Sequence, residues 1–308
     1  MINTVLGAIP GDELGPTLMH EHISWDRDGA DSVRSYSIDE VVGTMLPYLL
    51  ELRSFGCRTL VEATPSGAGR DLEILRRCSA RSGIHIITNS GAWDGGDNAG
   101  KAVPGYIKTS STDEISDGWS SEFFNGFGDT GVKPGFIKIA LGDTGEVTAL
   151  QEKLLRAAVR ASIRTALPLQ CHAAVADSAR RAFQIIEEEN LDYNKFIWVH
   201  ADTAGDFQLT KTMVGKGMWV EYDYLARVTD IEGYTELVKK TLDAGLADRL
   251  LLAHDAGSFY YGEKNDESTI YPFARIFKEF IPFWRKNGIS QATIDKLLTE
   301  NPKKVLDI

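Results

Sequence analysis

Leu18-Met19-His20-Glu21-His22 is a short apolar segment that ends in two histidines separated by one residue. The side chains of a β-strand alternate between its two faces. A strand over residues 17–22 would therefore direct His20 and His22 to one side and Glu21 to the other. Two imidazoles on the same face at the end of a buried strand indicate a metal site.

Seven further segments share this short, apolar, β-branched character. They are 58–64, 84–90, 136–140, 168–172, 196–200, 218–222 and 250–254. Helical patterns occupy most of the intervals, at 38–54, 70–82, 148–165, 175–190, 231–244 and 274–286. Alternating strands and helices predict an α/β fold with a parallel sheet. Eight units without a break in composition predict a single (β/α)8 TIM barrel, one domain over residues 1–308.

Two connections are too long to be tight links between neighbouring elements. They cover residues 91–135, after the third strand, and 256–272, after the eighth. Long connections at the carboxyl ends of barrel strands often carry function. We expect both to be loops that cover the substrate.

The bulk composition excludes several classes of partner. The 308 residues include 33 basic and 44 acidic side chains, and a net charge of -11 disfavours a nucleic-acid surface. No apolar run is long enough for a membrane span, and no basic leader precedes an apolar segment. The three cysteines, Cys57, Cys78 and Cys171, lack metal-binding spacing and are expected to be reduced and buried. We expect a cytoplasmic protein, although a removed signal peptide would leave no trace.

Residues with metal-site chemistry stand at the ends of further strands. In a barrel, the carboxyl ends of all the strands converge on one mouth. A single histidine there is more often a hydrogen-bonded core residue, but the combination predicts one metal centre. The residues that follow His20 and His22 in this set are Lys138, His172, His200 and Asp255.

Three residues in this pattern need separate interpretation. By alternation, His254 faces the helices when Asp255 faces the barrel, and His85 begins its strand at the opposite end. Lys138 is unexpected, because an ammonium group cannot bind a cation. From the residues alone, a buried lysine paired with an acid is as good an interpretation as a functional one.

Four motifs occur in order along the chain: Leu14-Gly15-Pro16-Thr17-Leu18-Met19-His20-Glu21-His22, then Gly135-Phe136-Ile137-Lys138-Ile139-Ala140, then a helix over 150–164 that leads into Cys171-His172-Ala173-Ala174, and finally Asn301-Pro302. Together they resemble the phosphotriesterase family of the amidohydrolase superfamily, over essentially the whole chain. Mononuclear deaminases of that superfamily are less similar. They usually carry a glutamate at the position of Val175.

The resemblance implies a binuclear centre. Lys138 would be carboxylated and would bridge two divalent ions, zinc first and cobalt or manganese as alternatives. His20, His22 and Asp255 would hold the more buried ion, and His172 and His200 the other. A metal-bridging hydroxide would attack the substrate, and Asp255 would carry the proton to the leaving group. The catalytic roles would thus fall to Asp255 and Lys138.

The resemblance also bears on the substrate. Triesterases tend to have a histidine at the position of Tyr224 and an acid at that of Thr203, and lactonases for phosphorylated sugars have an arginine at that of Ser258. The mouth is expected to be aromatic and uncharged, with these substrate-binding residues: Trp93, Tyr222, Tyr224, Phe259, Tyr260 and Tyr261.

We therefore expect a lactonase for a small lactone that is uncharged, sugar-like or weakly anionic. An organophosphate triesterase or a carboxylesterase is the alternative. A non-catalytic binding barrel is a remote alternative, because such a protein would be expected to have lost a ligand. The expected partner is a small-molecule lactone or ester, and pairing into a homodimer stays open.

Overall fold

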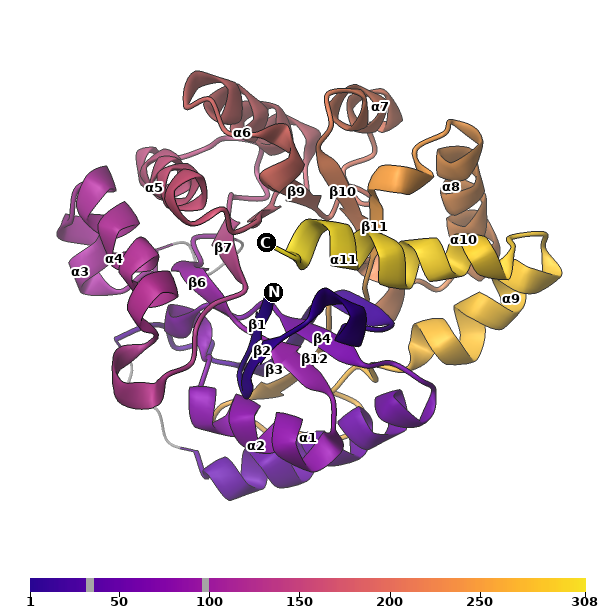
Figure 1. Cartoon of the computed structure of the whole chain (residues 1–308), viewed down its shortest axis with the longest axis horizontal. Helices are drawn as coiled ribbons and strands as arrows, with labels where there is room; N and C mark the ends of the chain where they lie inside the picture. Colours follow the sequence, from indigo (N-terminus) through magenta and orange to yellow (C-terminus); the bar gives the residue numbers. More distant parts are fainter. Residues whose placement is uncertain (32–35, 96–99) are drawn as a thin grey trace.

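The computed structural model describes residues 1–31, 36–95 and 100–308. A ring of parallel strands lies at the centre, with helices around it (Figure 1). One sheet has the order β11-β10-β9-β8-β7-β6 and the other β12-β3-β4-β5. The strands are β3 (Thr17–Trp25), β4 (Thr59–Glu62), β5 (His85–Ile87), β6 (Asn89–Ala92), β7 (Phe136–Ala140), β8 (Leu169–His172), β9 (Phe196–Val199), β10 (Trp219–Tyr222), β11 (Leu250–Leu252) and β12 (Ala256–Tyr260).

The two sheets are joined by continuity of the chain. β5 and β6 are separated only by Thr88, and three residues, 253–255, separate β11 from β12. β12 pairs in parallel with β3, with Ala256 opposite Glu21. The eighth strand position therefore returns to the first, and the fold is the (β/α)8 barrel that the sequence predicts.

Two outer helices with well-formed N-terminal caps begin where the sequence predicts. Ser37 accepts a hydrogen bond from the Glu40 N–H at the start of α1, and Thr148 and Gln151 form a reciprocal capping box at α5. The helices are α1 (Ile38–Ser54), α2 (Leu72–Ser82), α3 (Gly105–Thr109), α4 (Thr112–Asn125), α5 (Ala149–Thr165), α6 (Ala176–Glu188), α7 (Phe207–Gly215), α8 (Ile231–Asp243), α9 (Ile281–Lys286), α10 (Gln291–Asp295) and α11 (Asn301–Leu306).

Part of each connection predicted as a substrate-covering loop is regular structure. The first contains α3 and α4, and α4 packs against α5 as the barrel's third outer helix. Residues 96–99 of that connection lie outside the described part of the chain. The second contains β12, which is a barrel strand. The connections contain shorter loops than predicted, because α3, α4 and β12 were not recognised. That the remaining irregular segments cover the substrate stays a prediction.

The amino ends of the strands are closed. Side chains inside the barrel form an apolar cluster that includes Met19, Phe136 and Trp219, and Ile2 and Val305 from the two chain ends join it. Figure 1 shows the hairpin of β1 (Ile2–Thr4) and β2 (Gly7–Ile9) and helix α11 across this end. The cavity described below therefore lies at the opposite, carboxyl ends of the strands.

Within the described part of the chain, no helix has both the length and the apolar content needed to cross a bilayer.

Candidate metal centre

A bulge in β3 places two successive side chains toward the barrel interior. Leu18 pairs with Leu60 and Glu21 with Glu62, so β3 uses one more residue than β4 over this interval. Met19 consequently belongs to the interior cluster, and His20 also faces inward. Simple alternation would have placed these two neighbours on opposite faces.

Glu21 points the other way, as alternation predicts. Its carboxylate accepts hydrogen bonds from the N–H groups of His254 and Ala256, at 2.9 and 2.8 Å, and contacts the His254 Nδ1 at 2.9 Å. The other His254 ring nitrogen accepts from the Ile276 N–H at 2.8 Å. Both nitrogens of His254 are therefore used by the protein itself. Its role is structural: it ties β3 to the segment that follows β11.

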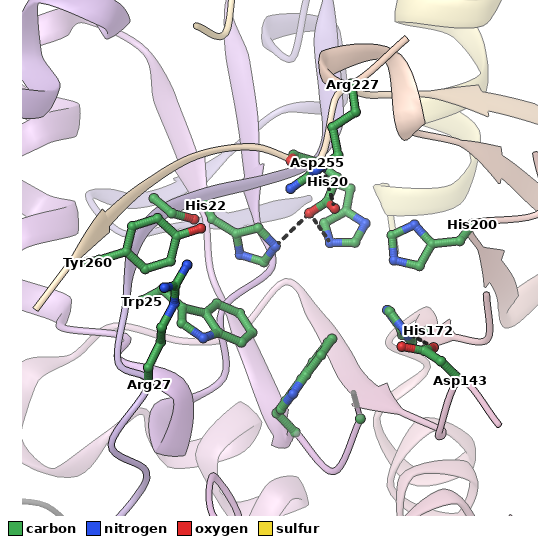
Figure 2. Close-up of a pocket in the computed structure, with 13 residues that line it drawn as sticks. His20, His22, Trp25, Arg27, Asp143, His172, His200, Arg227, Asp255 and Tyr260 are labelled. Carbon is green, nitrogen blue, oxygen red and sulfur yellow. Dashed lines mark hydrogen bonds and ion pairs between the residues drawn. The ribbon is translucent and has the colours of Figure 1, made fainter. Parts of the chain in front are cut away.

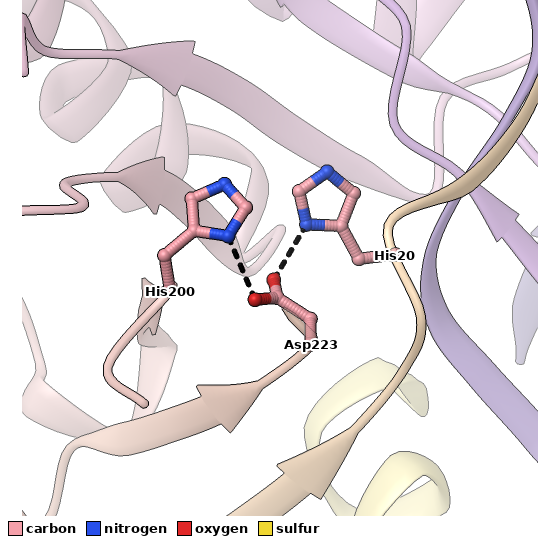
Figure 3. Close-up of side chains that lie close together, drawn as sticks. All are labelled: His20, His200 and Asp223. Carbon is pink, nitrogen blue, oxygen red and sulfur yellow. Dashed lines mark hydrogen bonds and ion pairs between the residues drawn. The ribbon is translucent and has the colours of Figure 1, made fainter. Parts of the chain in front are cut away.

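Asp223, the residue after β10, orients two of the histidines (Figure 3). Its Oδ2 lies 2.8 Å from the Nδ1 of His20, and its Oδ1 lies 2.7 Å from the Nδ1 of His200. All three side chains are buried. A carboxylate that fixes Nδ1 leaves Nε2 of each ring available to a metal, which is the usual second contact of a metal-binding histidine.

The other two histidines are held in the same way by different partners. His22 Nδ1 lies 2.8 Å from the Thr64 hydroxyl. His172 is held through the opposite nitrogen, because its Nε2 lies 2.9 Å from Oδ1 of Asp143. The buried His172 Nδ1 has no partner among the described residues. Each of the four rings thus has one nitrogen fixed by Asp223, Thr64 or Asp143 and its second nitrogen directed to the cluster, where those of His20 and His22 contact Lys138 and Asp255.

Burial favours the neutral form of three of these imidazoles, His20, His172 and His200. It lowers the pKa of His172 and of His200 to about 4, and it lowers the pKa of His20 well below its ordinary value. Neutral imidazole is the form that binds a metal. The electrostatics of the cluster therefore suit a cation held by ring nitrogens.

Asp255 completes the cluster from beyond the end of β11. Its Oδ1 lies 3.0 Å from His22 Nε2 and 3.7 Å from His20 Nε2. The residue has a left-handed backbone with φ of 52°, which is uncommon for a side chain other than glycine. Arg227 Nη1 donates to the main-chain oxygen of Asp255 at 2.8 Å and to its Oδ2 at 2.9 Å.

Lys138 lies at the floor of the cluster and is fully buried. Its Nζ is 3.3 Å from His20 Nε2. Among the described residues, no carboxylate lies within ion-pair distance of that nitrogen, so the interpretation as a lysine paired with an acid finds no partner here. Burial lowers the pKa of Lys138.

The donor atoms fit a divalent cation. Ligand-type atoms of His20, His22 and Asp255 lie within 4.8 Å of one another. Imidazole and carboxylate are the ligands that zinc and similar ions take. The unpartnered His172 Nδ1 adds a further donor in the same cavity.

The cluster opens into a cavity of about 820 Å³ (Figure 2). Of the residues predicted to bind substrate, Trp93 and Tyr260 line it, and Tyr224 lines a second cavity that shares His172, His200 and Asp255 with the first. The Trp93 ring contacts the His172 ring edge-on, with centroids 4.8 Å apart.

Three of the predicted substrate residues do not line either cavity. Tyr222 is buried, and its hydroxyl bonds to the Thr241 hydroxyl on α8 at 2.9 Å. Phe259 is buried in the outer core, and the Tyr261 hydroxyl donates to the main chain of Gly69 at 2.7 Å. The alternation of β10 and β12 explains this. These side chains face outward, while Asp223, Ser258 and Tyr260 face inward.

The expectation of an uncharged mouth was also wrong. Three charged side chains that were not predicted line the main cavity: Arg27, Asp143 and Arg227. Asp223 and Thr64 were missed as partners of the histidines. A period-two count along β10 could have placed Asp223 inside the barrel. No local signal marks the others, because they reach the site from loops.

Known proteins are similar in sequence to this chain over nearly its whole length. A family model described as the phosphotriesterase family matches residues 1–306. An aryldialkylphosphatase of Saccharolobus solfataricus is 27% identical, with 96% of each chain covered. A phosphotriesterase homology protein of Mycobacterium tuberculosis is 24% identical, and an N-acetyltaurine hydrolase of Homo sapiens is 25% identical, each covering 99% of this chain and 97% of its own.

Proposed function

This chain belongs to the phosphotriesterase family of metal-dependent hydrolases, and from that membership we propose that it is a binuclear lactonase. The observation that carries the proposal is the way in which the protein holds one nitrogen of each imidazole ring. All four histidines at the mouth have one nitrogen held by a residue outside the proposed ligand set, and the second nitrogen of His20 and His22 contacts only the other proposed ligands Lys138 and Asp255. Such second contacts are typical of metal-binding histidines and fix which nitrogen takes the ion.

In this proposal, His20, His22 and Asp255 hold one divalent ion and His172 and His200 hold the other. Lys138, carboxylated on Nζ, supplies the shared anionic ligand. Zinc is preferred, because it suits imidazole-rich sites, with cobalt or manganese as alternatives. When bound, the two ions polarise the ester carbonyl and make a water acidic enough to serve as nucleophile near neutral pH.

Asp255 is the residue that moves the proton. Its Oδ1 faces the histidine side of the site, and its Oδ2 faces Arg227. A carboxylate oxygen has two lone pairs, so Oδ2 can accept a proton while it keeps the contact with the guanidinium. The proton taken from the attacking water is then delivered to the alkoxide oxygen that leaves the acyl carbon.

The loop after β9 favours an ester over a phosphotriester. Asp202 is the acid of this loop, and its Oδ2 accepts from the Tyr234 hydroxyl at 2.6 Å and from the Tyr224 N–H at 2.9 Å. Tyr224 occupies the position at which the similar triesterases tend to carry histidine. Asp202 is thus held by the Tyr234 hydroxyl and the Tyr224 main chain, and position 224 offers no histidine to relay a proton from Asp255 to this loop.

An organophosphate triesterase or carboxylesterase is the second candidate, supported by the similarity to an aryldialkylphosphatase. Zinc-loaded protein should be assayed with a set of small lactones, an aryl phosphotriester and an aryl carboxylic ester. We expect the highest kcat/KM on a lactone, loss of activity with a chelator, and recovery with added zinc. A preference for the phosphotriester would overturn the lactonase assignment, and no turnover of any ester would favour the non-catalytic barrel.

A further inference from the structure

Two guanidinium groups line the cavity in front of the histidine cluster. Arg227 follows the short helix η6 (Tyr224–Ala226), and Arg27 lies just beyond the end of β3. In Figure 2, Arg227 lies beside Asp255, and Arg27 lies near Trp25 and Tyr260. An uncharged cavity lining would be expected for a neutral substrate. Two cationic side chains at the mouth therefore indicate a substrate of a different charge.

Arg27 is the outer of the two and contributes mainly its charge. Its guanidinium lies 4.0 Å from the centre of the Tyr260 ring, and its Nη1 pairs with Glu263 at 3.2 Å. Both partners of that ion pair are largely exposed, at 55% and 41%. An exposed pair of this kind is weak and readily exchanged. Arg27 can therefore attract an approaching anion, but its side chain is not held in one position.

Arg227 is held in place from several sides. Its Nη1 is fixed by two oxygens of Asp255. Its guanidinium carbon lies 5.0 Å from the ring centre of Tyr271 and 5.8 Å from that of Tyr224. The two rings and the two Asp255 contacts together limit the rotation of the guanidinium, so its remaining N–H groups point in set directions.

The backbone that carries Arg227 is itself anchored. Arg275, next to the helical segment Ile276–Phe280, donates through Nη1 to the main-chain oxygens of Leu225 and Ala226, at 2.9 and 3.0 Å. The Ala226 N–H donates to the His254 oxygen at 3.2 Å. Arg227 thus extends from a short helix that is tied both to the outer layer and to the chain before Asp255.

The outer edge of the Arg227 guanidinium is unused by the protein. Within the described residues, its Nε and Nη2 donate to no acceptor, and its side chain is 30% exposed. Arg227 lines both cavities at the site. A planar fork of N–H donors in a half-buried cavity suits a carboxylate or another oxyanion, which it can bind through two parallel hydrogen bonds.

We propose that Arg227 binds an oxyanion group of the substrate, such as a carboxylate or sulfonate. The lactone that enters the site would then already carry a negative charge before its ring is opened. The inference rests on the proposed function, because it names the substrate class of the same site. Arg27 adds long-range attraction at the rim. The anchoring of Arg227 before the substrate arrives means that little conformational freedom is lost on binding.

A pair of matched lactones tests the proposal. One is γ-butyrolactone with a ring carboxylate, and the other carries the uncharged carboxamide at the same carbon. Wild-type protein should show a kcat/KM for the anion about 10- to 100-fold higher, as expected for a charge-assisted, two-point hydrogen bond. Arg227→Gln should bring the ratio of the two kcat/KM values close to one, mainly by raising KM for the anionic lactone. Arg227→Lys should retain part of the preference, because it keeps the charge and loses the fork.

Arg249→Gln is the matched control. Arg249 also stacks on an aromatic ring, Trp219 at 4.6 Å, but it precedes β11 at the closed end of the barrel. Its replacement should leave the ratio unchanged. The proposal is overturned if the wild type prefers the carboxamide. It is also overturned if Arg227→Gln lowers kcat/KM equally for both lactones, since Arg227 would then only position Asp255.

A binding measurement separates this inference from the lactonase assignment. Tetrahydrofuran-2-carboxylate carries the anion but no ester, and its affinity for zinc-loaded protein can be measured by calorimetry. We expect about 10-fold or greater loss of affinity in Arg227→Gln, because the hydrogen bonds from the guanidinium to the anion are lost. If no lactone is hydrolysed but this loss is seen, the proposed function fails and the anion site stands. Equal affinity in wild type and Arg227→Gln overturns the anion site.

Discussion

Asp143 holds His172 through Nε2, the ring nitrogen that the other three histidines direct to the cluster: its Oδ1 lies 2.9 Å from His172 Nε2, and the buried Nδ1 has no partner among the described residues. The other three rings are held through Nδ1. In this arrangement His172 offers Nδ1 to the site. The choice of nitrogen follows from the position of Asp143, which lies three residues beyond Ala140, the last residue of β7.

The first prediction concerns that contact. Asp143→Ala should weaken binding of the second ion about 10- to 100-fold, because the His172 ring loses the partner that fixes its orientation. Titration of the metal-free protein with zinc measures the effect. Asp129→Ala, at an exposed site on η4 (Gly128–Thr130), is the control. Unchanged affinity in Asp143→Ala would show that the contact does not orient a ligand.

Asp223 should matter for both ions, since it contacts one histidine assigned to each. Asp223→Asn keeps the shape but supplies only one acceptor oxygen, so one of the two ring N–H groups loses its partner. We expect both zinc affinities to fall, by about 10-fold or more. The same titration shows this as two weakened steps. Loss of affinity at a single step would place both rings on one ion.

Lys138 is predicted to be a carbamate, because a cationic side chain beside two dications is electrostatically unfavourable. Lys138→Met should fold, since methionine fills the buried space, but should lose metal and activity together. Lys138→Ala should regain part of both when a short carboxylic acid such as propionate is added. Full metal content in Lys138→Met would exclude the bridging role.

Two tyrosines that are close in sequence should behave differently. Tyr222→Phe removes a buried hydroxyl contact with Thr241 and should lower the free energy of unfolding by about 1 kcal/mol, without changing substrate preference. Tyr224 is 41% exposed and lines a cavity at the site. Tyr224→Ala should alter the ratio of kcat/KM between lactones of different size. A change of preference in Tyr222→Phe alone would contradict the orientation of both side chains.

Much of the barrel could be predicted from the sequence, because buried strands have a strong local pattern. The segment 136–140 was predicted with the bounds that β7 has, and α1 was recognised from its apolar face. α4 was missed because Gly118 and several serines weaken its pattern. The capping box of Ser111 and Glu114 was the signal that could have revealed it.

The site was predictable only where strand ends determine it. The placement of His20, His22 and Lys138 at one mouth follows from the topology. Asp143 and Arg227 lie on loops, and their contacts depend on how distant segments pack, which no local pattern encodes. For Tyr222 and Phe259, the alternation of side chains along a strand is sufficient to predict the outward orientation that the structure shows. The bulge in β3 is a further tertiary feature, since it is seen only in the register with β4.

The central claim is that the barrel mouth holds two metal ions. The most direct test is the ratio of metal to protein, measured by elemental analysis. The sample is protein produced in medium supplemented with zinc and freed of loosely bound ions. We predict close to two ions per chain at full occupancy, and close to none after treatment with a strong chelator. A firm ratio of one or zero in the zinc-saturated protein would contradict the binuclear site.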